Sequence, residues 1–295
     1  MIASGWFLLG APWDCSGTGR GERAAPGALR TAGLTGLVSR DLGDSATTID
    51  STHRDQHTGV LALPETVRSA NALADALTGA LHDLPGKRPL VVGGDCSILL
   101  GIFPALRRSI GPVGLCFVDG HPDYLDSWES DTGETADMDL AVLTGAGAAT
   151  LVNLAGDPPM LAVSDTVLLG HRTQDLGETA LAELARLPGD LRRIDAATLM
   201  RDPAAAGRRA AAWLADAGRG VWLHLDLDVL DPGSLPAVTY PQPGGPDWEE
   251  LSAALGPVAR SPRLLGVSVA DLRPDLDPAG ALAAQVVDLL QHSLP

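Results

Sequence analysis

Short apolar segments alternate with helix-like segments along almost the whole chain. The apolar segments are rich in Val, Leu and Ile, and most end in Gly or Asp: 6–10, 88–95, 113–120, 165–171, 191–196, 220–228 and 263–271. Segments with a helical pattern lie between them, several with Pro or Asp near their first turn: 64–84, 136–145, 177–187, 203–218, 247–260 and 278–292. This alternation is typical of an α/β fold in which helices cover both faces of a mainly parallel sheet.

The chain shows no internal repeat and no low-complexity linker, so we expect one domain over residues 1–295. Segment 40–60 has the least regular pattern. An edge strand followed by a loop is the simplest interpretation of that segment.

Charge and composition exclude several classes of function. The formal net charge is −16, and Lys and Arg form no cluster, which argues against nucleic acid and anionic membranes as partners. No apolar stretch is long enough to span a bilayer, and the short N-terminal apolar run lacks the basic start of a secretion signal. The three cysteines are an odd number in a large domain, so we expect reduced thiols and a cytoplasmic protein.

Acidic and histidine side chains follow two of the expected strands. Asp119, His121 and Asp123 stand at alternate positions after 113–118, and Asp226 and Asp228 end the apolar segment 220–228. Ligands of open parallel sheets bind beyond the carboxyl ends of the strands, where alternate residues of an extended chain point to the same side. Buried carboxylates this close repel each other unless cations pair them, so the pattern predicts a metal cluster.

Two further residues near these motifs allow more than one interpretation. His224 shares the strand face of Asp226, where it is either a donor or proton shuttle beside the site or a packed core histidine. Cys96, in VVGGDCSILLG, is a small buried thiol, a nucleophile activated at a helix start, or a metal ligand. The residues around Cys96 do not by themselves choose among the three.

Four motifs together carry a family resemblance. GGDCS, DGHPD, HLDLDVLDP and GVSVADLRPDLDP follow in this order over nearly the whole chain. The set resembles the arginase or ureohydrolase family, which includes agmatinase and formimidoylglutamase, and LGAPWDCSGTGRGERAAPGALRTAGL resembles the opening of that family. The resemblance implies a three-layer α/β/α domain with an eight-stranded, mainly parallel sheet. It also implies a binuclear manganese site whose bridging hydroxide attacks a guanidinium or formimino carbon.

The resemblance also implies a ligand for each metal position. Asp119 and Asp226 match the residues that bridge two ions, His121 and Asp228 complete one ion, and Asp123 helps to complete the other. Cys96 stands where the family has the histidine of GGDHS. The implied ligands are therefore Cys96, Asp119, His121, Asp123, Asp226 and Asp228.

The cysteine changes the charge of this cluster. Four aspartates and a neutral histidine balance two divalent cations, whereas a Cys96 thiolate leaves one negative charge in excess. Because thiolate is soft and Mn²⁺ prefers oxygen and imidazole, we expect Mn²⁺ on the His121 side. The Cys96 side is expected to bind Mn²⁺ weakly, to hold zinc or iron, or to be empty. In this cysteine the chain resembles a branch of the family that hydrolyses hydroxyarginine, which the resemblance makes the first substrate to test.

Two residues are expected to contact the substrate, Asp271 and Asp175. Asp271, in VADLRP, matches the family position that pairs the guanidinium, and a carboxylate can accept two hydrogen bonds from that group. Asp175 matches a position that contacts a substrate α-amino group, although an ordinary loop carboxylate explains it equally well. Segment 132–145 contains no histidine where arginases have GNLHG, which argues against ordinary arginase activity.

The leading hypothesis is a metal-dependent amidinohydrolase. It would cleave a guanidino or hydroxyguanidino compound to urea or hydroxyurea plus an amine, with Asp271 holding the cation and Asp228 or another cluster carboxylate passing the proton. One alternative is an inactive binding or regulatory protein of the same fold. Another is a formimino or amide hydrolase with a single metal. The resemblance further implies a homo-oligomer, either a trimer or a hexamer.

Overall fold

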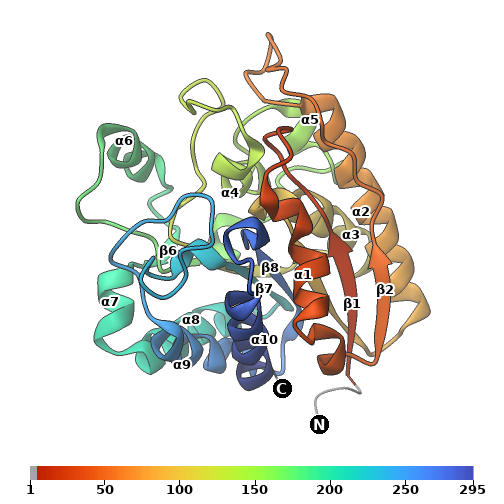
Figure 1. Cartoon of the computed structure of the whole chain (residues 1–295). Helices are drawn as coiled ribbons and strands as arrows, with labels where there is room; N and C mark the ends of the chain where they lie inside the picture. Colours follow the sequence, from red (N-terminus) through yellow and green to blue (C-terminus); the bar gives the residue numbers. More distant parts are fainter. Residues whose placement is uncertain (1–4, 295) are drawn as a thin grey trace.

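The computed structural model describes residues 5–294 and has at its centre one sheet of eight parallel strands (Figure 1). The strand order across the sheet is β2-β1-β3-β8-β7-β4-β5-β6. The strands are β1 Trp6–Ala11, β2 Arg40–Asp44, β3 Arg88–Gly93, β4 Gly114–Val118, β5 Thr166–Leu169, β6 Arg192–Ile194, β7 Val221–Asp226 and β8 Leu264–Ala270. This sheet confirms the predicted fold class, with every strand pair parallel.

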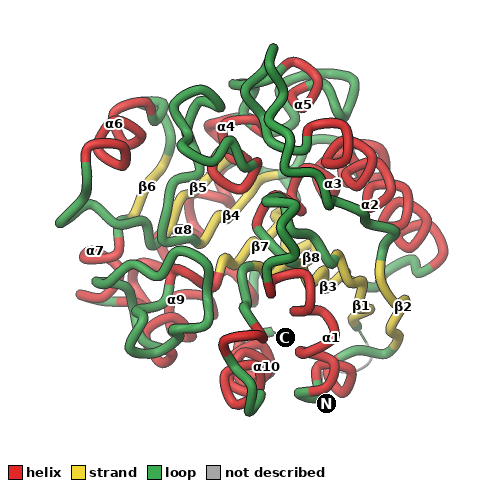
Figure 2. Tube along the Cα trace, turned by 45° about the horizontal axis from the view of Figure 1, so that its top comes forward, coloured by secondary structure: helices red, strands yellow, loops and turns green. Residues whose placement is uncertain are grey.

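Helices cover both faces of the sheet and make the three layers (Figure 2). One face carries α1, α7, α8, α9 and α10, and the other carries α2, α3, α4 and α5. The helices are α1 Ala25–Thr31, α2 Leu63–Asp83, α3 Leu99–Ser109, α4 Asp139–Leu143, α5 Ala149–Val152, α6 Glu178–Arg186, α7 Ala196–Arg201, α8 Pro203–Asp216, α9 Trp248–Ala259 and α10 Ala281–Ser293. Among residues 5–294, no helix combines the length and the apolar character needed to cross a bilayer.

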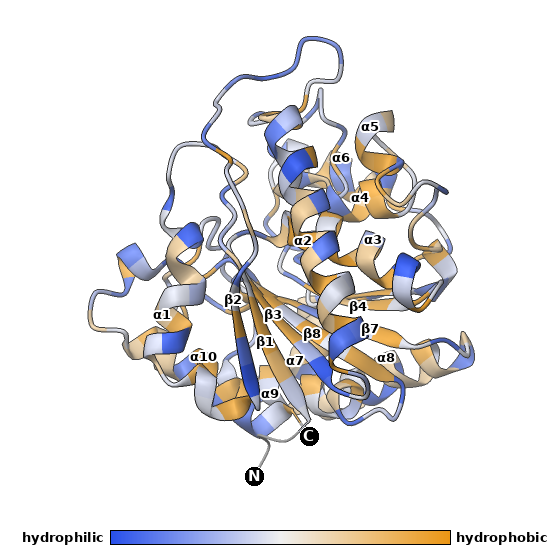
Figure 3. Cartoon of the chain, turned by 90° about the vertical axis from the view of Figure 1, so that its right-hand side faces the viewer, coloured by the Kyte–Doolittle hydropathy of each residue, from blue (hydrophilic) through white to orange (hydrophobic). Residues whose placement is uncertain are grey.

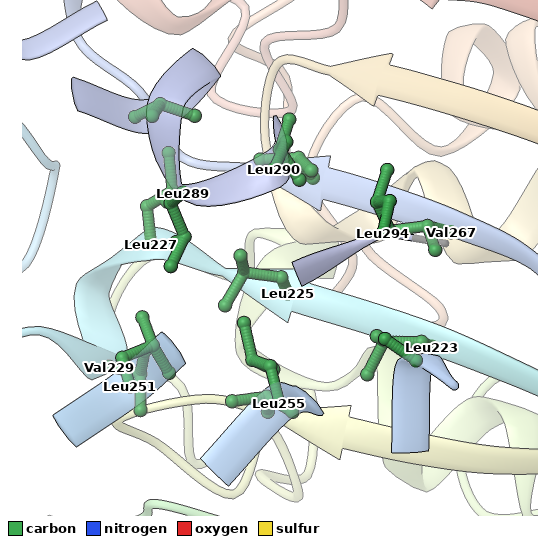
Figure 4. Close-up of a cluster of buried hydrophobic side chains, with 14 of the residues drawn as sticks. Leu223, Leu225, Leu227, Val229, Leu251, Leu255, Val267, Leu289, Leu290 and Leu294 are labelled. Carbon is green, nitrogen blue, oxygen red and sulfur yellow. The ribbon is translucent and has the colours of Figure 1, made fainter. Parts of the chain in front are cut away.

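Alternate strand residues supply the two hydrophobic cores. In β1, Trp6 and Leu8 face one layer of helices, whereas Phe7 and Leu9 face the other. The central strands are therefore apolar on both faces, as Figure 3 shows by their orange colour. Figure 4 shows part of one core, where leucines of β7 pack against leucines of α9 and α10.

Local signals explain where the long helices begin and how they pack. α2 starts with Pro64 in its first turn, where a missing N–H costs no hydrogen bond. α9 starts with a capping box between Asp247 and Glu250. Gly101 of α3 lies directly against Leu73 of α2, and a Cβ at this glycine would come within 2.8 Å of the leucine. The small residue lets these two helices pack closely.

The structure confirms the seven expected strands and the edge strand, which is β2. The helix expected at 136–145 is shorter: a 3-10 turn, Thr135–Asp137, precedes the five-residue α4. The short helices α5 and α7 were not predicted from the pattern, because four to six residues show too little periodicity.

Strand register brings the expected site residues to one edge of the sheet. Val118 of β4 pairs with Leu225 of β7, and Asp226 pairs with Ala270 of β8. The segments that follow β4, β7 and β8 therefore leave the sheet side by side at its carboxyl edge. Gly94, after β3, lies very close to the backbone of Trp13. A Cβ at this position would lie 1.7 Å from the Trp13 carbonyl oxygen, so only glycine fits.

We expect Leu225→Ala to lower the free energy of unfolding by about 2 to 5 kcal/mol, because it opens a cavity in a fully buried part of the core. Urea unfolding monitored by circular dichroism measures this change. Leu276→Ala is the control, since Leu276 is 50% exposed and its truncation should change stability by less than about 0.5 kcal/mol. Equal effects of the two substitutions would contradict the assigned core.

Candidate metal centre

The four central strands of the sheet, β3, β8, β7 and β4, bring the predicted ligands together. Cys96 opens a 3-10 turn just after β3, Asp119 follows β4, Asp226 ends β7 and Asp271 follows β8. All four side chains are nearly or completely buried. The rule that ligands bind at the carboxyl ends of parallel strands therefore holds here, and most of the predicted cluster lies at one place.

One group of potential ligands surrounds His121. Ligand atoms of Asp119, His121 and Asp228 lie within 4.8 Å of one another. The His121 ring nitrogen Nδ1 lies 2.8 Å from Asp228 Oδ2, and Asp119 Oδ2 is buried with no hydrogen-bond partner. Burial alone would lower the pKa of His121, but the neighbouring Asp228 raises it to about 9. Nitrogen and oxygen donors of this kind suit Mn²⁺.

A second group surrounds Cys96 and contains a residue that the sequence analysis missed. Ligand atoms of Cys96, Asp123 and Asp139 lie within 4.8 Å of one another. Cys96 Sγ lies 3.3 Å from Asp123 Oδ2 and 3.4 Å from the carbonyl oxygen of Ala136. Burial, followed by the charges of Asp123 and Asp139, raises the pKa of the Cys96 thiol. A neighbouring cation is the usual means of making such a thiol ionise.

A third group links the metal cluster to the predicted substrate residue. Carboxylate oxygens of Asp226, Asp228 and Asp271 lie within 4.8 Å of one another. Burial, followed by Asp228, raises the pKa of Asp271 to about 7. Asp271 has a φ of 66°, and its Oδ2 accepts a hydrogen bond of 3.1 Å from the backbone N–H of Thr239. A non-glycine residue in this backbone region is frequent at functional sites.

The cluster as a whole fits divalent cations. Burial and mutual repulsion raise the pKa values of Asp119, Asp123 and Asp226, which shows how costly these carboxylates are as free anions. Each of the three has a ligand atom within 4.8 Å of other potential metal ligands, most of them carboxylate oxygens. Cations that pair the carboxylates remove this cost, so the residues present match a metal centre.

The cluster opens into a cavity of about 280 Å³. Six of the residues singled out in the sequence line it: Cys96, His121, Asp123, Asp226, Asp228 and Asp271. Asp119 is only 1% exposed and lies behind them. A small molecule in this cavity would contact both sides of the cluster at once.

Further cavity residues come from segments far away in the sequence. Arg20 forms ion pairs with Glu22 and Glu134 and contacts the Tyr240 hydroxyl at 3.4 Å. Burial, followed by Asp271 and Asp95, raises the pKa of Glu22 to about 9. Sequence reasoning missed these residues, because the opening motif that contains Arg20 and Glu22 assigned them no role, and only the fold brings residues 20–22, 134 and 240 together.

Two predicted site residues lie apart from the cavity. His224 is fully buried, its Nδ1 contacts Ser268 Oγ at 2.7 Å, and its ring stacks on Phe117 with centroids 5.3 Å apart. Burial lowers the pKa of His224 to about 3, which favours the packed core histidine over the proton shuttle. Asp175 is exposed in a loop and does not line the cavity, which favours the ordinary loop carboxylate. All three cysteines are free thiols, as expected.

Comparison with known proteins agrees with this geometry. The family model described as Arginase family matches residues 4–294. The chain belongs to the arginase family. The arginase of Brevibacillus brevis is 29% identical over 96% of this chain and 95% of its own length. The N(omega)-hydroxy-L-arginine amidinohydrolase of Streptomyces lavendulae is 30% identical over 98% of this chain and 93% of its own length.

A solved structure shows the same fold. The arginase from Bacillus caldovelox superimposes with a TM-score of 0.86 and 27% sequence identity, covering 98% of this chain and 97% of that one. Family membership makes this arginase-family chain a metal-dependent hydrolase of linear amidine C–N bonds. The motifs on which the resemblance rested are therefore those of the family.

We expect Glu22→Gln to stabilise the protein increasingly as the pH rises. The pKa of Glu22 is about 9 in the folded state against 4.5 ordinarily, so folding takes up a proton between these values and wild-type stability falls with rising pH. Glutamine does not titrate. Urea unfolding at pH 5 and pH 8 measures the difference, with the exposed Glu249→Gln as control. A gain for Glu22→Gln that is equal at both pH values would contradict the raised pKa.

Proposed function

We propose that this member of the arginase family hydrolyses a guanidino compound, with an N-hydroxyguanidino compound as the first candidate. The observation that carries the proposal is that carboxylate oxygens of Asp226, Asp228 and Asp271 lie within 4.8 Å of one another and line one cavity. Two expected metal ligands and the expected substrate-binding carboxylate are therefore adjacent. A cationic or neutral amidine bound there would lie against both. The amidinohydrolase of Streptomyces lavendulae, whose name states a hydroxyarginine substrate, supports the hydroxylated form.

Each cluster residue has a proposed role. Asp119 and Asp226 would bridge two cations, His121 and Asp228 would complete one of them, and Asp123 with Cys96 would hold the other. We assign Mn²⁺ to the His121 side and a weakly held Mn²⁺, zinc or iron to the Cys96 side, because the donor atoms differ in softness. Bound cations would supply Lewis acidity, which lowers the pKa of water and polarises the amidine carbon.

The remaining residues orient the substrate and move protons. Asp271 has one oxygen that accepts from Thr239, and its carboxylate can accept further hydrogen bonds from the amidine N–H groups. Asp228 lies between His121 and Asp271, where it can pass a proton to the leaving nitrogen. In the overall reaction, the central carbon gains a C–O bond from water and loses its C–N bond to the alkyl amine. The products are the amine and urea, or hydroxyurea from the hydroxylated substrate.

The cysteine is consistent with a hydroxylated substrate. A thiolate in the cluster adds negative charge and weakens the Lewis acid, so a more electrophilic carbon compensates. An N-hydroxyl group withdraws electrons from the amidine carbon and makes the amidine less basic than a plain guanidine. The alternatives, an inactive protein of this fold or a formimino or amide hydrolase with a single metal, predict different metal contents and substrates.

We further propose a cytoplasmic homo-oligomer, either a trimer or a hexamer, that acts on a small molecule. The free thiols support a reducing location. Size-exclusion chromatography with light scattering measures the assembly, and a monomeric mass would contradict it.

The central test is a panel of guanidino compounds with added Mn²⁺, run on wild type and on Cys96→His. Turnover of hydroxyarginine above arginine, agmatine and guanidino acids is expected for wild type. Cys96→His should bind Mn²⁺ more tightly, by about tenfold or more, because imidazole replaces a soft ligand. Failure of every amidine for both proteins would refute the proposed reaction. Metal analysis on the same samples separates two ions from one tight zinc.

Asp271→Asn should lower kcat/KM by roughly 10- to 100-fold, because the amide cannot hold a cationic substrate group as the carboxylate does. Metal content should stay at the wild-type value if Asp271 contacts the substrate. Elemental analysis therefore accompanies the kinetics. A variant that loses its metal in step with its activity would assign Asp271 to the cluster instead. The exposed Asp275→Asn is the matched control.

A further inference from the structure

Asp139 is a buried carboxylate that neither the implied ligand set nor the proposed reaction uses. It begins the short helix α4 and is 0% exposed. Neither of its carboxylate oxygens has a hydrogen-bond partner. Buried polar groups are nearly always paired, and an unpaired carboxylate costs even more than a neutral group. A partner for these two oxygens is therefore required.

Protonation does not supply that partner. Whether charged or protonated, Asp139 has no hydrogen-bond donor directed at either carboxylate oxygen. The nearby Cys96 thiol has a single hydrogen, which already faces Asp123 Oδ2 and the carbonyl oxygen of Ala136. One hydrogen cannot satisfy this many acceptors, whereas one cation can.

Backbone hydrogen bonds hold two of the three potential ligands, Asp123 and Asp139, side by side. The N–H of Ala141 donates to the carbonyl oxygen of Asp123 at 3.2 Å, and the N–H of Leu125 donates to that of Asp137 at 3.1 Å. These bonds join the segment that carries Asp123 to the segment that carries Asp139. Ligand atoms of Cys96, Asp123 and Asp139 consequently lie within 4.8 Å of one another, close enough to share one ion.

We propose that Asp139 is a metal ligand and that Cys96, Asp123 and Asp139 form a site for a thiophilic divalent cation of the zinc type. The inference rests on the metal centre of the proposed function and names a ligand that the family motifs do not contain. Cys96 and Asp123 line the cavity, whereas Asp139 lies behind them. These three residues are the ligands particular to this side of the cluster, in addition to the oxygens that Asp119 and Asp226 would share between the two cations.

The charge of this ligand set sets it apart from the His121 side. A thiolate and two carboxylates hold a divalent cation tightly and lower its Lewis acidity. His121 with Asp119 and Asp228 presents one fewer anion and no sulfur. The two sides of the cluster therefore bind different cations, and the Cys96 side should prefer cadmium, cobalt and zinc to manganese.

Cadmium titration of the full-length, chelator-treated protein tests this site, with thiolate-to-cadmium charge-transfer absorption as the readout. Wild type should develop the band, and Cys96→Ser should lose it. Asp139→Asn should weaken cadmium binding on the Cys96 side by roughly 10- to 100-fold, because one anionic ligand becomes a neutral amide. Asp131→Asn, which removes a carboxylate from the same cavity wall, should titrate like wild type.

The outcomes separate this inference from the proposed function. If wild type binds cadmium with the thiolate band and Asp139→Asn binds it equally well, Asp139 is not a ligand and the inference is wrong. If wild type binds no divalent cation at all, the metal centre of the proposed function fails as well. A band that persists in Cys96→Ser also overturns the site.

If a variant does not fold, a measurement on wild type alone still tests the inference. Anomalous scattering from a cadmium-loaded crystal should place the ion within bonding distance of Cys96 Sγ and an Asp139 oxygen. A cadmium ion bound to Cys96 but out of reach of Asp139 would overturn the inference. Circular dichroism of the metal-free variants checks their folding, and Asp139→Asn should remain folded because it removes a buried charge.

Discussion

Repulsion among buried carboxylates is the constraint on which this structure depends. The parallel sheet brings the ends of β3, β8, β7 and β4 together, and two layers of helices exclude water from the side chains there. Asp119, Asp123 and Asp226 consequently have raised pKa values that reflect burial and one another. Bound cations would offset the free-energy cost of burying these like charges, so the fold and the metal chemistry depend on each other.

The cluster is not symmetric, and its asymmetry follows from one thiol. His121 and its carboxylates are hard donors, whereas Cys96 offers sulfur to a neighbouring position. Under the proposed function, a softer, more anionic site would bind cations firmly but activate water less, which would favour a substrate whose amidine carbon is already electron-poor. The proposed metal and the proposed substrate are thus linked through the same side chain.

The cavity also has a wall that contains none of the predicted metal ligands. Arg20, Glu22, Glu134 and Tyr240 form a charged network beside Asp271. This network comes from loops that follow different strands, and such loops differ most freely among proteins of one fold. These side chains therefore add to the cavity wall charges that the metal-binding motifs do not contain.

The sequence by itself determined the architecture and the core of the cluster. Short apolar segments that alternate with helical ones predicted the strands, and DGHPD and HLDLD placed five potential ligands at strand ends, because these signals lie within a few residues of one another. Only the tertiary structure decided that Asp139 joins Cys96, that Glu22 and Arg20 reach the cavity, and that His224 packs on Phe117. Those contacts join distant segments through packing and register, for which a local pattern carries no signal.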